Sequence, residues 1–229
     1  MSLVLAIDTA TDFGSVAVGE PGNVAAELEF TQRRHASELM PSIVAALGST
    51  GCGFSDLSHI VVADGPGSFT GLRIGFATAR GILRELPSLE LFTAPSMLGL
   101  AFVARKAGDG AVAALYDALR GDVFGAVYSF KAESVITDLA PTIGTVESLR
   151  QRSAVKPAVV VGDGALLYRE TARDWAGCEP VGPPDLVPKA SALIDLLALD
   201  GAVIRIANLE EFEPQYGRAF LCSKTRIFG

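Results

Sequence analysis

Apolar positions recur at helical spacing in two stretches of the first half of the chain. In the first stretch, residues 35–47, the apolar positions form two adjacent rows, which together contain Leu39, Met40, Ile43, Val44 and Leu47. A second stripe follows residue 71 and comprises Leu72, Phe76, Ala79, Leu83 and Leu86. Such stripes are typical of amphipathic helices. Pro41 is expected to end or bend the early part of the first helix, because proline lacks a backbone N–H.

Short apolar runs bounded by polar turns predict strands elsewhere. In the first half they cover 3–7, 15–18, 24–30, 60–63 and 91–94, and the first three read as an antiparallel meander. A short helix is predicted at 96–105. In the second half, strands are predicted at 111–116, 123–130 and 158–161, and helices from Thr145 to Arg152, from Ala165 and over 191–199. This mixture indicates an α/β protein.

A polar, glycine-containing linker at 106–110 is the best candidate for a domain boundary. It divides the chain into a unit of residues 1–105 and a smaller α/β unit of residues 106–189. The apolar helix near 190–200 is expected to return to the first unit. Both units contain hairpin strands and a glycine turn from strand to helix, which is a faint internal repetition.

The stretch 64–73 joins an apolar strand to the second helix and holds three glycines. Pro66 and Gly67 suit a type II turn with a positive φ at Gly67, and Thr70 is expected to cap the helix. Amides at a helix N-terminus favour phosphate. A phosphate or nucleotide loop is therefore one reading, made of Asp8, Thr9, Gly65, Gly67, Ser68 and Thr70. In the other, the glycines only let a strand turn into a closely packed helix, and these residues alone leave both open.

The amino-acid composition limits the classes of function that are open to the chain. The 229 residues are 49% hydrophobic and 20% charged, with a net charge of −7, which is ordinary for a globular protein and unfavourable for a free-standing nucleic-acid binder. The three cysteines lack the spacing of a disulfide framework or a zinc site. No apolar run approaches the ~18 residues of a membrane span. We expect a cytoplasmic protein without a membrane anchor.

Candidate catalytic groups are scarce. His35 and His59 are the only histidines, and they lie in different sequence contexts, so neither a metal cluster nor a Ser-His-Asp set can be assembled. We therefore predict no catalytic and no metal-binding residues. An alternative from another class is an ATP-dependent transferase or small-molecule kinase, which would need Asp8, the 65–71 loop and Asp163 to face one cleft and hold Mg-ATP.

Three blocks of the first half, in the right order, resemble the TsaB (YeaZ) family. They are Leu5-Ala6-Ile7-Asp8-Thr9-Ala10-Thr11, the run from His35 to Ile43, and Gly65-Pro66-Gly67-Ser68-Phe69-Thr70-Gly71-Leu72-Arg73-Ile74-Gly75. In the second half the likeness is thinner and rests on Asp117, Arg120 and Gly121 and on the 161–165 turn. The resemblance implies an actin-like, Hsp70-like ATPase (ASKHA) fold with two lobes of mixed sheet flanked by helices.

The resemblance also implies a function. Members of this family act as scaffolds that bind TsaD, with TsaE, in the complex that forms N6-threonylcarbamoyladenosine at position 37 of tRNAs. It further implies no cofactor for the chain by itself, ATP at the level of the complex, indirect contact with tRNA, and a homodimer when TsaD is absent. TsaD-like relatives carry a His-x-x-x-His metal pair, and the corresponding positions here are Ser96 and Leu100, which cannot ligate a metal as histidines do.

The two apolar stripes are the candidate partner surface. The scaffold hypothesis predicts that the helices at 36–47 and 71–86 pair with helices of TsaD, through Leu39, Met40, Ile43, Leu47, Leu72, Phe76, Ala79 and Leu83. The alternative is that the same residues pack in the core of the chain itself, and the pattern alone favours neither.

Overall fold

A six-stranded mixed sheet forms the first lobe. The computed structural model describes residues 2–31, 34–105, 110–209 and 212–216. The strand order is β10-β5-β4-β1-β2-β3, in which β1 pairs antiparallel with β2 and parallel with β4. The strands are β1 (Leu3–Asp8), β2 (Phe13–Glu20), β3 (Asn23–Thr31), β4 (Leu57–Ala63), β5 (Glu90–Ala94) and β10 (Ile204–Ile206).

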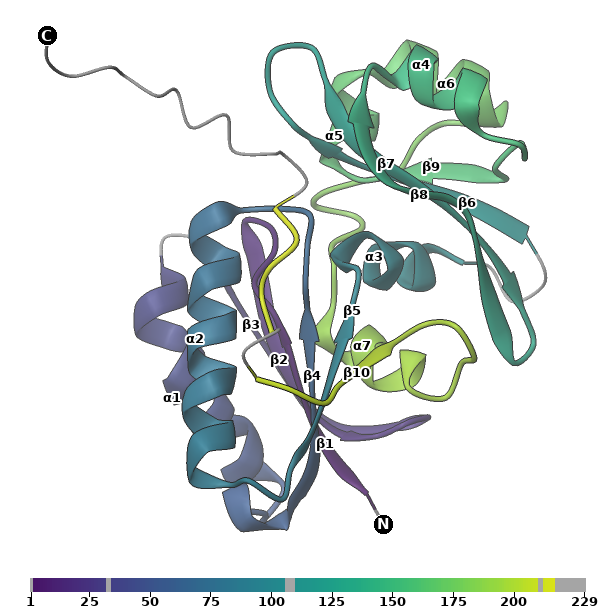
Figure 1. Cartoon of the computed structure of the whole chain (residues 1–229). Helices are drawn as coiled ribbons and strands as arrows, with labels where there is room; N and C mark the ends of the chain where they lie inside the picture. Colours follow the sequence, from purple (N-terminus) through teal and green to yellow (C-terminus); the bar gives the residue numbers. More distant parts are fainter. Residues whose placement is uncertain (1, 32–33, 106–109, 210–211, 217–229) are drawn as a thin grey trace, which may run out of the picture.

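Helices cover both faces of this sheet. On one face lie α1 (His35–Ser49) and α2 (Phe69–Glu85), and on the other lie α3 (Ser96–Ala104) and α7 (Ala190–Leu196) (Figure 1). The alternation along β1 explains the arrangement, since Leu5 and Ile7 pack with α1 and α2 whereas Val4 and Ala6 pack with α3 and α7. Because side chains of a strand alternate between faces, one short apolar strand supplies two cores.

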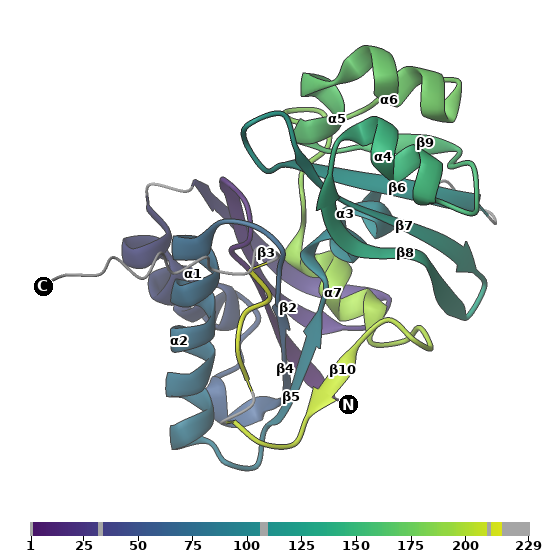
Figure 2. The ribbon, with the colours of Figure 1, turned by 45° about the horizontal axis from the view of Figure 1, so that its top comes forward.

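The second lobe repeats the plan. Its sheet has the order β8-β7-β6-β9 and contains β6 (Gly110–Asp117), β7 (Val123–Lys131), β8 (Ser134–Gly144) and β9 (Val159–Val161). Figure 2 shows α4 (Val146–Arg152), α5 (Asp163–Leu167) and α6 (Arg169–Ala176) on the side of this sheet that faces away from the first lobe. In both lobes an antiparallel meander is extended by a strand parallel to its first strand, so the expected actin-like fold of two mixed-sheet lobes is confirmed.

The two lobes share one hydrophobic cluster. Residues of α3 and α7 pack there with Val4 of the first sheet and Tyr128 of the second. The predicted boundary falls between α3 and β6, and residues 106–109 lie outside the described part. The helix expected near 190–200 is α7, and it contacts β1 and β2 of the first lobe.

Three local expectations need correction. Pro41 does not end α1, which continues to Ser49, because the ring is exposed and only one carbonyl on the solvent side loses its partner. Two strands were missed. Strand β8 has an almost unbroken row of exposed and half-buried residues, and β10 is only three residues long, so neither has a clear apolar alternation.

The last described segment, 212–216, packs against α2 (Figure 1). The buried ring of Phe212 stacks on Phe76 with centroids 4.1 Å apart, and the Arg80 guanidinium donates to the carbonyls of Leu209 and Phe212. The Gln215 amide donates to the Asp64 carbonyl at 2.7 Å. The segment therefore completes the core on the α1 and α2 side of the sheet. Among the helices described, none combines the length and the apolar character that crossing a bilayer requires.

Candidate functional site

The glycine-rich stretch 64–73 joins β4 to α2 and lies directly on the turn that follows β1. The Ser68 amide donates to the Ala10 carbonyl at 2.6 Å, and the Ser68 hydroxyl accepts from the Gly71 amide at 3.2 Å. Ser68 is thus the N-cap of α2, and the prediction that Thr70 caps this helix is wrong. The positive φ of the turn belongs to Gly65, at 114°, and not to Gly67.

The glycines of this stretch permit close packing. A Cβ on Gly71 would lie 2.0 Å from the Thr9 carbonyl oxygen, and one on Gly67 would lie 2.1 Å from the Ala10 carbonyl oxygen. On Gly75 it would meet the Thr9 hydroxyl at 2.4 Å. Side chains do not tolerate such approaches, so these positions need glycine to seat α2 against the end of β1.

The six residues predicted to form a phosphate loop are not presented together. Asp8, Thr9 and Gly65 are buried, Thr70 is exposed, and only Gly67 and Ser68 line the cleft described below. Close packing accounts for the glycines directly. Phosphate binding at this loop stays a prediction.

The predicted partner-binding residues divide sharply. Six of them, Leu39, Ile43, Leu47, Phe76, Ala79 and Leu83, are each at most 4% exposed and pack in the core between the helices and the sheet. Leu72 is also buried, but it packs in the cluster that the two lobes share. Only Met40, at 42%, is open to solvent, and Val44 beside it is 53% exposed. Seven of the eight residues therefore pack in the core of the chain itself, which is the alternative that the sequence left open, and partner binding through these two helices stays a prediction.

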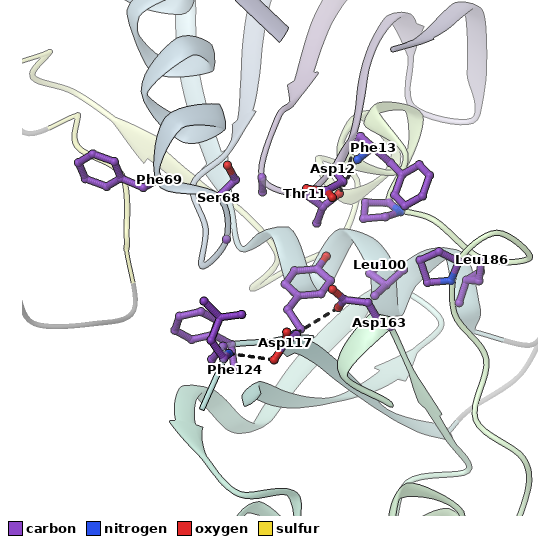
Figure 3. A pocket seen from close by; sticks show the side chains of 18 of the residues that line it. Thr11, Asp12, Phe13, Ser68, Phe69, Leu100, Asp117, Phe124, Asp163 and Leu186 are labelled. Atoms are coloured by element: carbon purple, nitrogen blue, oxygen red, sulfur yellow. Dashed lines mark hydrogen bonds between the residues drawn. The ribbon is translucent and has the colours of Figure 1, made fainter. Parts of the chain in front are cut away.

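A cleft of about 590 Å³ opens between the lobes (Figure 3). The first lobe contributes residues 10–13 and 67–69, and the second contributes 116–119, Phe124, Gly162 and Asp163. Leu100 of α3, the proline-containing connection at 183–188 and Tyr216 complete the lining. The cleft is thus built from the turns that follow the first strands of the two sheets.

Carboxylates of both lobes face this cleft, and none of the described residues that line it is a lysine or an arginine. Asp12 projects from the first lobe, and Asp117 and Asp163 project from the second (Figure 3). Asp163 Oδ1 accepts from the amides of Asp117 and Gly164, at 3.2 and 2.9 Å. Burial raises the pKa of Asp163 above its ordinary value, and the neighbouring charge of Asp117 acts in the same direction.

The hairpin between β6 and β7 holds an unusual backbone at the mouth of the cleft. Leu119 and Arg120 have φ of 64° and 60°, and Gly121 follows with 92°. A left-handed conformation costs a non-glycine residue roughly 1–2 kcal/mol. Leu119 is nevertheless 67% exposed, so burial of its side chain does not offset this cost. Strain of this kind clusters at functional sites, which makes the hairpin part of the candidate site.

A buried carboxylate, Asp8, and a half-buried one, Asp64, lie behind the cleft and the loop. Burial raises the pKa of Asp8 to about 6, and one of its oxygens, Oδ2, has no hydrogen-bond partner. Burial likewise raises the pKa of Asp64 to about 6, although a hydrogen bond from Thr93 opposes the shift. Burial raises the pKa of the Tyr116 phenol, which lies in the lining, and the nearby charge of Asp8 raises it further.

The histidines do not join the cleft. His35 is buried at the start of α1 and meets Phe30 edge-on at 5.3 Å. Its Nε2 has no hydrogen-bond partner among the described residues. Burial lowers its pKa. His59 is bound between Ser2 and Glu90. Throughout the described residues, no three His, Cys, Asp or Glu side chains are placed to hold a metal ion.

Comparison with known proteins gives consistent results for most of the chain. A family model described as "TsaD: tRNA N6-adenosine threonylcarbamoyltransferase" matches residues 28–159. The "tRNA threonylcarbamoyladenosine biosynthesis protein TsaB" of Escherichia coli is 31% identical over 223 residues, which cover 94% of each chain. The protein of the same name from Bacillus subtilis is 30% identical over 179 residues, or 76% of each chain.

Solved structures agree with these relatives. A crystal structure of a Pseudomonas aeruginosa protein described as similar to peptidase YEAZ superposes with a TM-score of 0.77 at 26% identity, covering 95% of this chain and 100% of that one. YeaZ from the same organism gives a TM-score of 0.75 at 25% identity, covering 94% and 100% of the two chains. Both similarities extend across the two lobes and the cleft between them.

Proposed function

The chain belongs to the TsaB (YeaZ) family of tRNA threonylcarbamoyladenosine biosynthesis proteins, and we propose that it acts there as a non-catalytic subunit. Its role is to bind a TsaD-type threonylcarbamoyltransferase and to hold that enzyme in an active form, with TsaE as a further partner. ATP is used by the complex, and contact with tRNA is made through the partners. The complex works in the cytoplasm, where tRNA is modified.

Ser96 and Leu100 occupy the positions of the metal-binding histidines of TsaD-like proteins, and their structural contacts support the non-catalytic role. The Ser96 hydroxyl donates to the Pro66 carbonyl at 2.6 Å, which ties α3 to the glycine-rich loop. Leu100 is 1% exposed and belongs to the cluster shared by the lobes. The positions at which the catalytic relatives carry metal-binding histidines thus serve packing in this chain.

The outer face of α1 is the observation that carries the proposed role. Met40 and Val44 are exposed there, and the surrounding positions Ala36, Ala45 and Gly48 are small and also exposed. On α2, which lies beside α1 (Figure 1), Ala77 and Gly81 are exposed in the same way. An apolar surface with few long side chains lets helices of another chain approach closely. The same face would pair two copies when TsaD is absent, which light scattering can detect.

A binding measurement with a purified TsaD-type protein tests the proposal. Val44→Glu is expected to weaken the complex by at least about tenfold, because a charge is placed at the centre of an apolar contact. Leu167→Glu is the matched control, since Leu167 is 59% exposed on α5 of the other lobe. Circular dichroism should show both variants folded. Equal binding by wild-type protein, Val44→Glu and Met40→Glu would overturn this surface.

One observation favours a second candidate function, an ATP-dependent transferase or kinase acting alone. Asp163 and residues Gly67 and Ser68 do line one cleft, as that function requires. Asp8, however, is buried and is not part of the lining. Calorimetric titration of the purified chain with Mg-ATP distinguishes the two functions. Tight binding followed by turnover without partners would replace the subunit proposal with the enzymatic one.

A further inference from the structure

Several backbone amides around the cleft are already bonded to neighbouring groups of the protein. In the first lobe, the amide of Ala10 donates to Asp8 Oδ1 at 3.0 Å and that of Phe13 to Thr11 Oγ1 at 3.2 Å. The Ser68 amide donates to the Ala10 carbonyl. A phosphate needs several convergent free amides or a cationic side chain, and these three amides do not contribute to such a site.

The second lobe follows the same pattern. The Leu119 amide donates to Asp117 Oδ1 at 2.9 Å, and the amides of Ala118 and Asp122 donate to carbonyls within the hairpin. Asp163 takes the amides of Asp117 and Gly164. The second oxygens of the Asp117 and Asp163 carboxylates take no part in these bonds and remain available to a ligand as acceptors.

The charge of the cleft is not compensated within the described part of the chain. Asp12, Asp117 and Asp163 form no ion pair with any described residue, and the lining holds no basic side chain. The raised pKa of Asp163 reflects this lack of compensation, since burial and the charge of Asp117 both oppose its ionisation. A bound cation would relieve that repulsion.

Aromatic and aliphatic side chains stand next to these carboxylates. Phe13 faces the cleft from the first lobe and Phe124 lies beside Asp117 on the second (Figure 3). Leu100, Leu186 and the Tyr116 ring add apolar surface. Aromatic faces attract ammonium groups as well as apolar bodies, and a cleft of about 590 Å³ has the size of a small-molecule site.

We propose that the cleft between the lobes binds a small molecule with a primary ammonium group on a flat apolar body. The ammonium lies at the carboxylates of Asp117 and Asp163, and the body lies between Phe13 and Phe124. This site is separate from the outer face of α1. The binding measurement with Val44→Glu tests only the proposed subunit role, so a failure of that role can be distinguished from a failure of the amine site.

Tryptamine is a suitable probe, with indole-3-propionate as its anionic counterpart, because both carry the same ring. Titration followed by amide NMR spectra is expected to give saturable shifts at Leu119, Gly121 and Gly164 with tryptamine. The anionic probe should bind at least about tenfold more weakly, since a charge-assisted hydrogen bond is lost and repulsion replaces it. Equal affinities for the two probes, or preferential binding of Mg-ATP in the cleft, would overturn the proposal.

Two carboxylate variants locate the binding. Asp163→Asn should weaken tryptamine by about tenfold. Asp117→Asn, at the other carboxylate of the site, should do the same and keeps the test valid if the first variant is unstable. Asp174→Asn on the exposed side of α6 is the matched control and should bind as the wild-type protein does. Wild-type affinity in both cleft variants would overturn the proposal.

A last variant excludes an occupant from the chain itself. Residues 217–229 carry Arg218, Lys224 and Arg226 and no acidic residue. Replacing these three by glutamine in the full-length chain should leave the affinity for tryptamine unchanged. An affinity that rises about tenfold would mean that this segment competes for the cleft, and it would overturn the free amine as the natural occupant.

Discussion

Two glycines of α2 provide a matched test of why the glycine-rich stretch has its sequence. Gly71 lies against the Thr9 carbonyl, where an added Cβ would sit at 2.0 Å, whereas a Cβ on Gly81 would meet nothing within 4 Å. Both residues are inside the same helix. Replacing each by alanine therefore makes the same chemical change in two different environments.

The expected effects have opposite signs. Gly81→Ala should stabilise the protein by about 0.5–1 kcal/mol, because alanine loses less conformational entropy in a helix than glycine. Gly71→Ala gains the same stabilisation from conformational entropy, but the added Cβ forces α2 or the end of β1 to move by about 1 Å. Overpacking of a core costs typically 1–3 kcal/mol, and here the obstacle is a backbone carbonyl, so we expect a net loss of about 3 kcal/mol.

Urea unfolding followed by circular dichroism measures both changes. With a slope of about 2–3 kcal/mol/M for a chain of this size, the midpoint of Gly71→Ala should fall by about 1 M while that of Gly81→Ala rises slightly. Coincident midpoints for the two variants would refute the packing explanation. Close packing would then not explain why glycine occupies these positions, and the prediction of a phosphate-binding loop would be favoured instead.

Two further substitutions probe buried parts of the fold. Asp8→Asn should gain roughly 2 kcal/mol in unfolding free energy relative to wild type between pH 4 and pH 7, measured by urea titrations at both pH values. The folded pKa of about 6 exceeds the ordinary value of 3.8, so ionisation destabilises the wild type as pH rises. Phe212→Ala should lose about 3–5 kcal/mol with its stack on Phe76. Ile204→Ala, 62% exposed, should lose almost nothing, and similar losses in these two variants would show that the 212–216 segment does not belong to the core.

The sequence predicted most of the regular elements because their local signals agree with their burial. Thr145 was expected to begin a helix, and its hydroxyl does accept from the Ser148 amide at 3.2 Å. Residues 3–7 lie in a strand that is buried on both faces, which a continuous apolar run indicates. Prediction was weaker where several turn signals overlapped: Ser68 and Thr70 are both good N-caps, and only the contact of Ser68 with Ala10 decides between them.

The candidate site was harder to predict than the fold. Asp163 was named for a cleft, and it does line one, but the opposite wall of that cleft includes residues such as Phe13, which is more than a hundred positions away along the chain. No local pattern marks such a meeting. The hairpin at 117–121 could have drawn more attention, since a turn with Leu119 and Arg120 at its centre lacks the asparagine and glycine that left-handed residues usually require.

The two apolar rows on α1 have different roles, because the chain folds before it binds a partner. A monomer that buries Leu39, Ile43 and Leu47 gains roughly 2 kcal/mol from each side chain before any partner is present. Giving these residues to a partner would expose the core that holds α1 on its sheet. A partner can therefore use only the second row, at Met40 and Val44. A charge placed at Leu39 should unfold the helix. A charge placed at Val44 should weaken association and leave the fold intact.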